Sequence, residues 1–227
     1  MSLLEISQLK KSYQSPEGAL HLVVDVPSFE MAAQDEVALS GESGSGKTTF
    51  LNLIAGIVPP DHGTIRLGER ELGDLSESAR DRLRAMELGY IFQTFNLLQG
   101  FTCLENVVLG MSFGGKADRS RATELLDRVG LSHRLNHYPR QLSTGQQQRV
   151  AVARALSSEP RLVLADEPTG NLDPENAAEV LNLIRETCRE SKAALLLVSH
   201  DREVLAQFDS SRDLGEINQA GRKEGSR

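Results

Sequence analysis

Short apolar runs separated by polar stretches predict an α/β protein. The apolar runs at 162–165 and 193–198 are typical of central strands in a parallel sheet, because such strands are covered on both faces. Pro27 favours an edge position or a strand end for the run around it. Further strands are predicted at 3–9, 20–29, 37–39, 64–67 and 89–92.

Three segments have helical patterns in the α/β part of the chain. Residues 48–57 are apolar on nearly all faces and end before two prolines, which predicts a buried helix. Residues 74–87 alternate in charge and indicate a solvated helix. A third helix is predicted over 174–189, with Asp173 as its N-cap and Pro174 at its first position.

The hydrophobic pattern of the chain changes between Gln93 and Ser157, where helical periodicity dominates and no long β-strand pattern occurs. We expect a helical subdomain at about 94–157, inserted into an α/β domain that spans 1–217. The pattern fades after Phe208, and residues 218–227 are polar with little periodicity. These last residues are predicted to form a disordered tail.

Composition narrows the class of protein. The 227 residues carry a net charge of −7, which argues against a nucleic-acid surface. The two cysteines lie far apart and favour a reduced compartment. No apolar run reaches bilayer length, the first residues lack a signal-peptide core, and Ser2 excludes myristoylation. We therefore expect any work at a membrane to depend on a partner.

A glycine-rich turn between an apolar strand and an apolar helix carries the clearest chemistry. Residues 41–48 fit G-x-x-x-x-G-K-[ST] at every fixed position, and a Ser/Gly linker seldom lies between a buried strand and a buried helix. Lys47 is expected to reach the β- and γ-phosphates of a nucleotide, and the Thr48 hydroxyl to ligate Mg²⁺. The predicted nucleotide-binding residues here are Gly41, Glu42, Ser43, Gly44, Ser45, Gly46, Lys47, Thr48 and Thr49.

Two further elements complete a phosphate-transfer site. Asp166 and Glu167 follow an apolar strand, where the first can hold Mg²⁺ and the second can activate water. Without the phosphate loop upstream, two acidic residues at this place would be interpreted as part of a loop or a helix cap. Ser143 and Gln146 form a capping-box pattern that could also bind a γ-phosphate. Ser143 lies only 23 positions before Asp166, so it cannot easily fold back onto its own phosphate loop.

Five motifs in order make the chain resemble the ATP-binding-cassette (ABC) ATPases over roughly residues 1–208. They are the phosphate loop, Gln93 after GYIF, LSTGQ at 142–146, ADEPTGNLD at 165–173 and VSHD at 198–201. Within that family, the stretches FQTFNLLQGFTCLENV at 92–107, QQQRVAVARAL at 146–156 and ADEPTGNLD are similar to the LolD/MacB/FtsE group. That group drives lipoprotein release, macrolide-type export and cell-division signalling. The resemblance implies a P-loop NTPase (RecA-like) core with a mostly parallel sheet, an N-terminal antiparallel β subdomain and the inserted helical subdomain.

The resemblance also implies roles for individual residues around the nucleotide. Tyr13 would stack on adenine, and Gln93 would sense Mg²⁺ and the attacking water while linking to a membrane partner. His200 would contact the γ-phosphate and position Glu167. The implied catalytic residues are Glu167, His200, Gln93 and Lys47. The implied metal ligands are Thr48, Gln93 and Asp166.

Further implied roles concern a second copy of the chain. Ser143, Gly145 and Gln146 would bind the ATP held by the opposite subunit, and Asp173 would lie at the dimer interface. Thr144 departs from the family pattern by replacing the first glycine of LSGGQ. The region after His200 lacks the family's apolar strand, so that edge of the sheet is expected to be short or irregular.

The resemblance implies an ATP-hydrolysing subunit that closes head to tail with a second copy around two ATP–Mg²⁺. Its expected partner is a multi-span permease, its expected place the cytoplasmic face of the inner membrane, and no nucleic acid is expected. The alternatives are a soluble cassette ATPase in DNA repair or translation and an FtsE-like signalling ATPase. An apolar cluster, consisting of Phe95, Leu97, Leu98 and Phe101, would receive a coupling helix or form the core of the helical subdomain.

Overall fold

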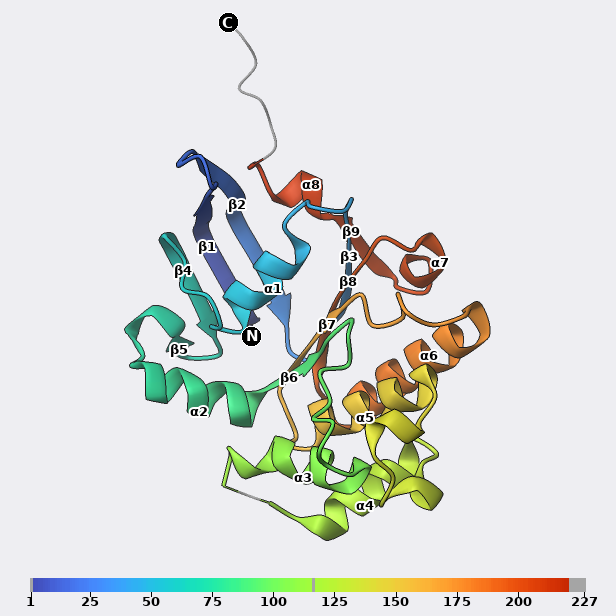
Figure 1. The fold of residues 1–227 in the computed structure, drawn as a ribbon. Coiled ribbons are helices and arrows are strands. Elements are labelled where there is room, and N and C mark those ends of the chain that lie inside the picture. The colour runs from blue at the N-terminus through green and yellow to red at the C-terminus, as the bar shows by residue number, and fades with distance from the viewer. Residues whose placement is uncertain (1, 116, 221–227) are drawn as a thin grey trace, which may run out of the picture.

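The computed structural model describes residues 2–115 and 117–220 and builds them around two β-sheets (Figure 1). The parallel sheet has the order β6-β7-β8-β3-β9, and the antiparallel sheet has the order β2-β1-β4-β5. The parallel strands are β3 (Glu36–Ser40), β6 (Leu88–Ile91), β7 (Leu162–Asp166), β8 (Ala194–Ser199) and β9 (Ser210–Asp213). The antiparallel strands are β1 (Ser2–Gln14), β2 (Leu20–Ala32), β4 (His62–Leu67) and β5 (Arg70–Glu71).

The central strands of the parallel sheet are covered on both faces, as their continuous apolar runs predicted. Every residue of β7 and β8 is buried. Leu164 belongs to the apolar cluster shared with the antiparallel sheet, whereas its neighbour Val163 belongs to a second cluster on the other side. This alternation follows from the two-residue period of a strand.

Helices cover both faces of the parallel sheet. Helix α1 (Lys47–Ile54) packs into the cluster shared with the antiparallel sheet, and α6 (Pro174–Glu190) packs against the opposite face. The Asp173 carboxylate caps α6 by accepting the N–H of Asn176 at 3.1 Å, which confirms the predicted cap. Helix α1 ends before the predicted position 57, because the chain turns at Gly56 with φ of +63°.

Between β6 and β7 the chain forms the inserted helical subdomain. Helices α3, α4 and α5 enclose an apolar cluster of their own, which includes Val107, Leu126 and Val150 (Figure 1). Asn106 is fully buried within this subdomain and donates to the carbonyls of Leu98 and Phe101. The bounds are α3 (Cys103–Ser112), α4 (Arg119–Arg128), η2 (Ser132–Arg134), η3 (Pro139–Gln141) and α5 (Thr144–Leu156).

The first two strands are longer than predicted. Strand β1 continues through the polar residues to Gln14, and Tyr13 pairs with His21 of β2 in the same hairpin rather than lying in a loop. At the far end of the hairpin the side chains on both faces are exposed or half-buried, so apolar and polar residues do not alternate there. The hydrophobic pattern therefore could not predict this part of the two strands. Strand β2 is an edge strand, as Pro27 predicted.

The described part of the chain after β8 contains one more strand and ends near β2. Strand β9 has four residues and pairs with β3, which confirms that this edge of the sheet is short. The predicted tail starts at 218, yet Asn218 is buried and bonded to β2, so that boundary is wrong by a few residues. Residues 221–227 lie outside the described residues. The remaining helices are η1 (Leu72–Asp74), α2 (Glu77–Glu87), α7 (Arg202–Leu205) and α8 (Leu214–Ile217).

Candidate functional site

A cleft of about 680 Å³ lies at the edge where the parallel strands end. Strands β3, β7 and β8 run in the same direction, so the segments that follow them meet at one edge. The cleft brings together residues from four predicted motifs that are far apart in the chain. Its lining residues are Val23, Glu42, Ser43, Gly44, Gly46, Lys47, Thr48, Thr49, Gln93, Asp166, Glu167 and His200.

The glycine-rich loop leads into α1 without any side-chain cap. Gly46 is the N-cap residue, has φ of +92° and makes no side-chain capping bond, and the first turn of α1 contains no acidic residue. The first N–H groups of a helix have no partner within that helix, and together with the helix dipole they favour an anion. A phosphate group therefore fits the beginning of α1.

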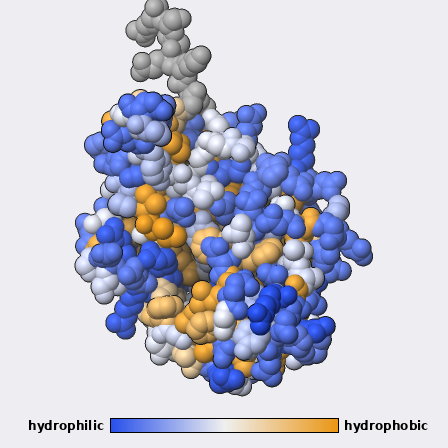
Figure 2. Space-filling view, viewed as in Figure 1, coloured by the Kyte–Doolittle hydropathy of each residue, from blue (hydrophilic) through white to orange (hydrophobic). Residues whose placement is uncertain are grey.

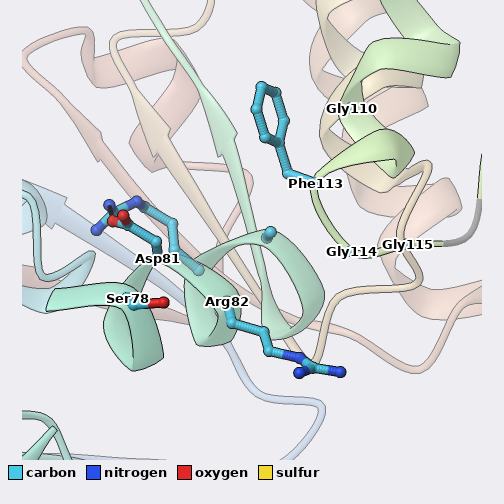
Figure 3. A pocket seen from close by; sticks show the side chains of 9 residues that line it. Ser78, Asp81, Arg82, Gly110, Phe113, Gly114 and Gly115 are labelled. Atoms are coloured by element: carbon cyan, nitrogen blue, oxygen red, sulfur yellow. Dashed lines mark hydrogen bonds and ion pairs between the residues drawn. The ribbon is translucent and has the colours of Figure 1, made fainter. Parts of the chain in front are cut away.

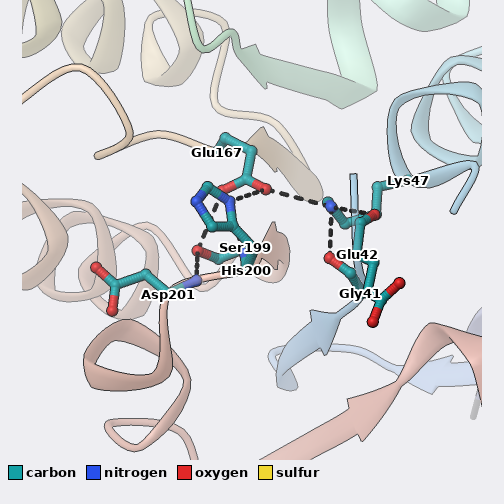
Figure 4. A network of polar contacts seen from close by, with 7 residues as sticks. All are labelled: Gly41, Glu42, Lys47, Glu167, Ser199, His200 and Asp201. Carbon is teal, nitrogen blue, oxygen red and sulfur yellow. Dashed lines mark hydrogen bonds and ion pairs between the residues drawn. The ribbon is translucent and has the colours of Figure 1, made fainter. Parts of the chain in front are cut away.

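Lys47 lies inside the loop and connects it to the carboxylate of Glu167 (Figure 4). Its ammonium donates to the carbonyls of Gly41 at 2.6 Å and Glu42 at 3.0 Å, and it lies 3.4 Å from Oε1 of Glu167. The side chain is 9% exposed, so its charge is largely shielded from water. An incoming phosphate would meet a buried ammonium that bonds to two carbonyls and lies beside the carboxylate of Glu167.

Glu167 is positioned by the chain that follows β8. Its Oε1 lies 2.8 Å from Nδ1 of His200, and its Oε2 accepts from the Ser199 hydroxyl at 3.2 Å and from the His200 N–H at 3.3 Å (Figure 4). The backbone of Glu167 has φ of +46°, a region that non-glycine residues rarely adopt. Such backbone strain is frequent where a side chain must be aimed at a reacting group.

Asp166 ends β7 beside the loop and is only 7% exposed. Burial raises the pKa of its carboxyl, and the neighbouring Glu167 raises it further, whereas a hydrogen bond from Thr48 and the charge of Lys47 lower it. A hydroxyl and a carboxylate in contact are oxygen ligands of the kind that Mg²⁺ prefers. The residues present therefore fit a magnesium ion at this point.

We expect the Asp166→Asn variant to be more stable than the wild type when no nucleotide is bound. An acid whose pKa is raised by folding costs stability once it ionises, so the cost is present at neutral pH and disappears as the pH falls below the ordinary range of the carboxyl. The free energy of unfolding should rise by about 0.5–2 kcal/mol at pH 7. Urea denaturation at pH 7 and at pH 4 checks this expectation, and a gain that is equal at both pH values would contradict it.

Several predicted site residues lie elsewhere. Among the described residues that line the cleft, Tyr13 does not occur, and its side chain is 42% exposed near the end of the β1–β2 hairpin. Ser143, Gly145 and Gln146 do not line it either. They begin α5, where Ser143 and Gln146 form the predicted capping box, and a Cβ on Gly145 would lie 2.9 Å from Oδ1 of Asn176.

The structure adds residues that sequence reasoning missed. Val23 of β2 lines the cleft, and the Ser199 hydroxyl bonds to both Glu167 and the Asp201 N–H. Ser199 lies within the VSHD motif, so its position beside His200 was a usable signal.

Comparisons with known proteins place this geometry among ATP-binding cassettes. A family model described as "ABC transporter" matches residues 24–170. The lipoprotein-releasing system ATP-binding protein LolD of Pseudomonas syringae pv. tomato is 45% identical over 212 residues, covering 92% of each chain. The protein of the same description from Hydrogenovibrio crunogenus is 43% identical over 218 residues, covering 94% of each.

A solved structure agrees over nearly the whole chain. The dimeric post-hydrolysis state of the ATP-binding cassette MJ0796 bound to ADP and Pi superposes with a TM-score of 0.86 at 31% identity. The match covers 96% of this chain and 95% of that one. A second structure, described as dimeric MJ0796, a bacterial ABC transporter cassette, gives a TM-score of 0.85 at 32% identity.

Proposed function

The chain belongs to the ABC transporter family as an ATP-hydrolysing subunit, and from this premise we propose that it powers the release of lipoproteins from a membrane. The observation that carries the proposal is the 43–45% identity to LolD proteins across 92–94% of the chain. An acidic net charge of −7 speaks against the alternative of a cassette that works on nucleic acid.

Catalysis in this proposal rests on residues that the cleft already brings together. The free N–H groups at the start of α1 and the Lys47 ammonium would bind the β- and γ-phosphates of ATP. Glu167 would accept a proton from the attacking water, and His200 would keep the carboxylate aimed while contacting the γ-phosphate. Gln93, which also lines the cleft, would orient the water.

Thr48 and Asp166 would hold Mg²⁺, and Gln93 would complete its protein ligands. When bound there, the ion would supply positive charge close to the phosphate oxygens. Because Asp166 is buried beside Glu167, it would ionise more readily with the cation present than without it.

A second copy of the chain would complete the site. Ser143, Gly145 and Gln146 start α5 outside the cleft of their own chain, next to the start of α6. In a head-to-tail pair they would face the γ-phosphate bound by the partner, and Asp173 at the start of α6 would lie at the interface. The dimeric structures of MJ0796 support a pair of cassettes.

The membrane partner would dock on the helical side of the molecule. No helix among the described residues is long and apolar enough to cross a membrane. Figure 2 shows apolar side chains gathered around α3, where Leu98, Phe101 and Phe113 are 43%, 42% and 74% exposed. Leu97 of the predicted apolar cluster is instead buried in the helical subdomain.

Phe113 also lines a cleft of about 650 Å³ between α2 and the end of α3 (Figure 3). Arg82 and Asp81 lie on the α2 side of this cleft and Gly110 on the α3 side. An apolar residue beside charged ones suits a short amphipathic helix from a permease loop at the cytoplasmic face of the membrane.

The test is a pull-down from gently solubilised native membranes with tagged Glu167→Gln protein and Mg-ATP. A Lys47→Ala bait, which is not expected to hold the nucleotide, serves as the matched control. Recovery of a multi-span protein with a large extracytoplasmic domain by the first bait alone supports the proposal. Recovery of soluble or nucleic-acid-bound partners only would overturn it and leave the ATPase assignment intact.

A further inference from the structure

Asn218 is a buried polar residue outside the motifs, and all of its side-chain bonding capacity is used. Its carbonyl oxygen accepts the N–H of Asp25 at 2.7 Å and of Ala220 at 3.2 Å. Its amide donates to the carbonyls of Val23 at 2.9 Å and Ser45 at 3.1 Å. A side-chain amide has two donors and an acceptor oxygen with two lone pairs, so no capacity is left.

These bonds connect three parts of the chain that are distant in sequence. Asn218 follows α8, which packs beside β2 (Figure 1). Val23 and Asp25 belong to β2, whose outer edge is unpaired within the sheet. Ser45 belongs to the phosphate loop. Asn218 thus covers a free strand edge and simultaneously bonds to the loop that is to bind nucleotide.

The bond to Ser45 acts on a peptide group that bears directly on phosphate binding. In a trans peptide the carbonyl of Ser45 and the N–H of Gly46 point in opposite directions. Because the Ser45 carbonyl accepts from Asn218, the Gly46 N–H points away from Asn218, and Gly46 itself lines the cleft.

The loop has little room for another arrangement on this side. A Cβ on Gly46 would lie 2.8 Å from the Val23 carbonyl and 3.4 Å from Nδ2 of Asn218. Val23 itself lines the cleft. The phosphate loop, Val23 of β2 and Asn218 are therefore packed against one another. A substitution of Asn218 should disturb the position of both the loop and Val23, which line the nucleotide cleft.

We propose that Asn218 is a positioning residue for ATP, which orients the Ser45–Gly46 peptide of the phosphate loop and ties it to the β2 wall. Its removal would let this peptide turn and would reduce the fraction of molecules ready to bind. The apparent dissociation constant for nucleotide rises as that fraction falls. The inference rests on this loop being the ATP site.

The test compares Asn218→Asp and Asn218→Ala with the wild type. The aspartate keeps the acceptor for Asp25 but places a carboxylate oxygen against the carbonyls of Val23 and Ser45. The alanine removes both donors without adding charge. The control is Asn136→Asp, which makes the same change at an exposed residue of the helical subdomain. The readouts are the dissociation constant of a fluorescent ATP analogue, the KM and kcat for ATP, and the unfolding temperature without nucleotide.

We expect both Asn218 variants to raise the dissociation constant and KM by roughly tenfold, with kcat at saturating ATP within about twofold of the wild type. A lower unfolding temperature with an unchanged dissociation constant would overturn the inference, because Asn218 would then serve the fold alone. An alanine variant that fails to fold would overturn it for the same reason. Failure of the wild type to bind the analogue would instead refute the nucleotide site itself.

Discussion

Replacing Glu167 with glutamine is expected to slow ATP hydrolysis by about 10²–10⁴-fold while ATP still binds. This loss corresponds to roughly 3–5 kcal/mol of activation free energy. Glutamine keeps the size of the side chain and can still accept from Ser199 and the His200 N–H, but it cannot take a proton from water. The expected defect therefore lies in the chemical step, measured as phosphate release at saturating Mg-ATP.

A slow chemical step should also trap the closed pair of subunits. Size-exclusion chromatography of Glu167→Gln with Mg-ATP is expected to show a dimer, and adding Ser143→Ala should weaken it, since Ser143 would bind the partner's nucleotide. The matched control is Glu186→Gln, which makes the same change on an exposed residue of α6. Wild-type turnover in the Glu167→Gln variant would exclude Glu167 as the general base.

Removing the ammonium of Lys47 is expected to weaken ATP binding by about 10²–10³-fold, because a buried charge that loses its partner costs about 3–4 kcal/mol. In Lys47→Ala the phosphates would face the loop carbonyls of Gly41 and Glu42 and the carboxylate of Glu167 with no cation between them. Titration with a fluorescent ATP analogue measures the change.

Two further variants separate position from charge. Lys47→Arg keeps the charge, but its planar fork cannot enter the site as a compact ammonium does, so we expect it to recover little of the affinity. Lys192→Ala removes a lysine from an exposed position and should bind ATP as the wild type does. A dissociation constant within threefold of the wild type in Lys47→Ala would contradict the role given to Lys47.

The site motifs could be predicted because each is contiguous in the chain. The loop at 41–48, the acidic pair Asp166 and Glu167 at the end of β7 and His200 directly after β8 carry their spacing in the sequence, and the apolar runs beside them indicate strands that end at a common edge. The caps of α5 and α6 were predictable for the same reason, since a cap involves residues only three positions apart.

Other features depend on contacts between distant segments, which no local pattern records. The continuation of β1 to Gln14 depends on pairing with β2, and its exposed sides left no apolar alternation to find. The predicted tail boundary failed because Asn218 is polar, and a polar residue near the end of a chain usually contacts water. Its burial follows from the unpaired edge of β2 and the nearby loop carbonyl.

The sequence by itself determined the fold class and the ATP-hydrolysing activity, because spacing within one segment sets the local geometry of loops and helix starts. Only the tertiary structure decided that the Lys47 ammonium lies beside Glu167, that the Ser199 hydroxyl bonds to Glu167, and that Asn218 bonds to the phosphate loop. These relations arise from the order of strands in the sheet, which brings segments together irrespective of their distance along the chain.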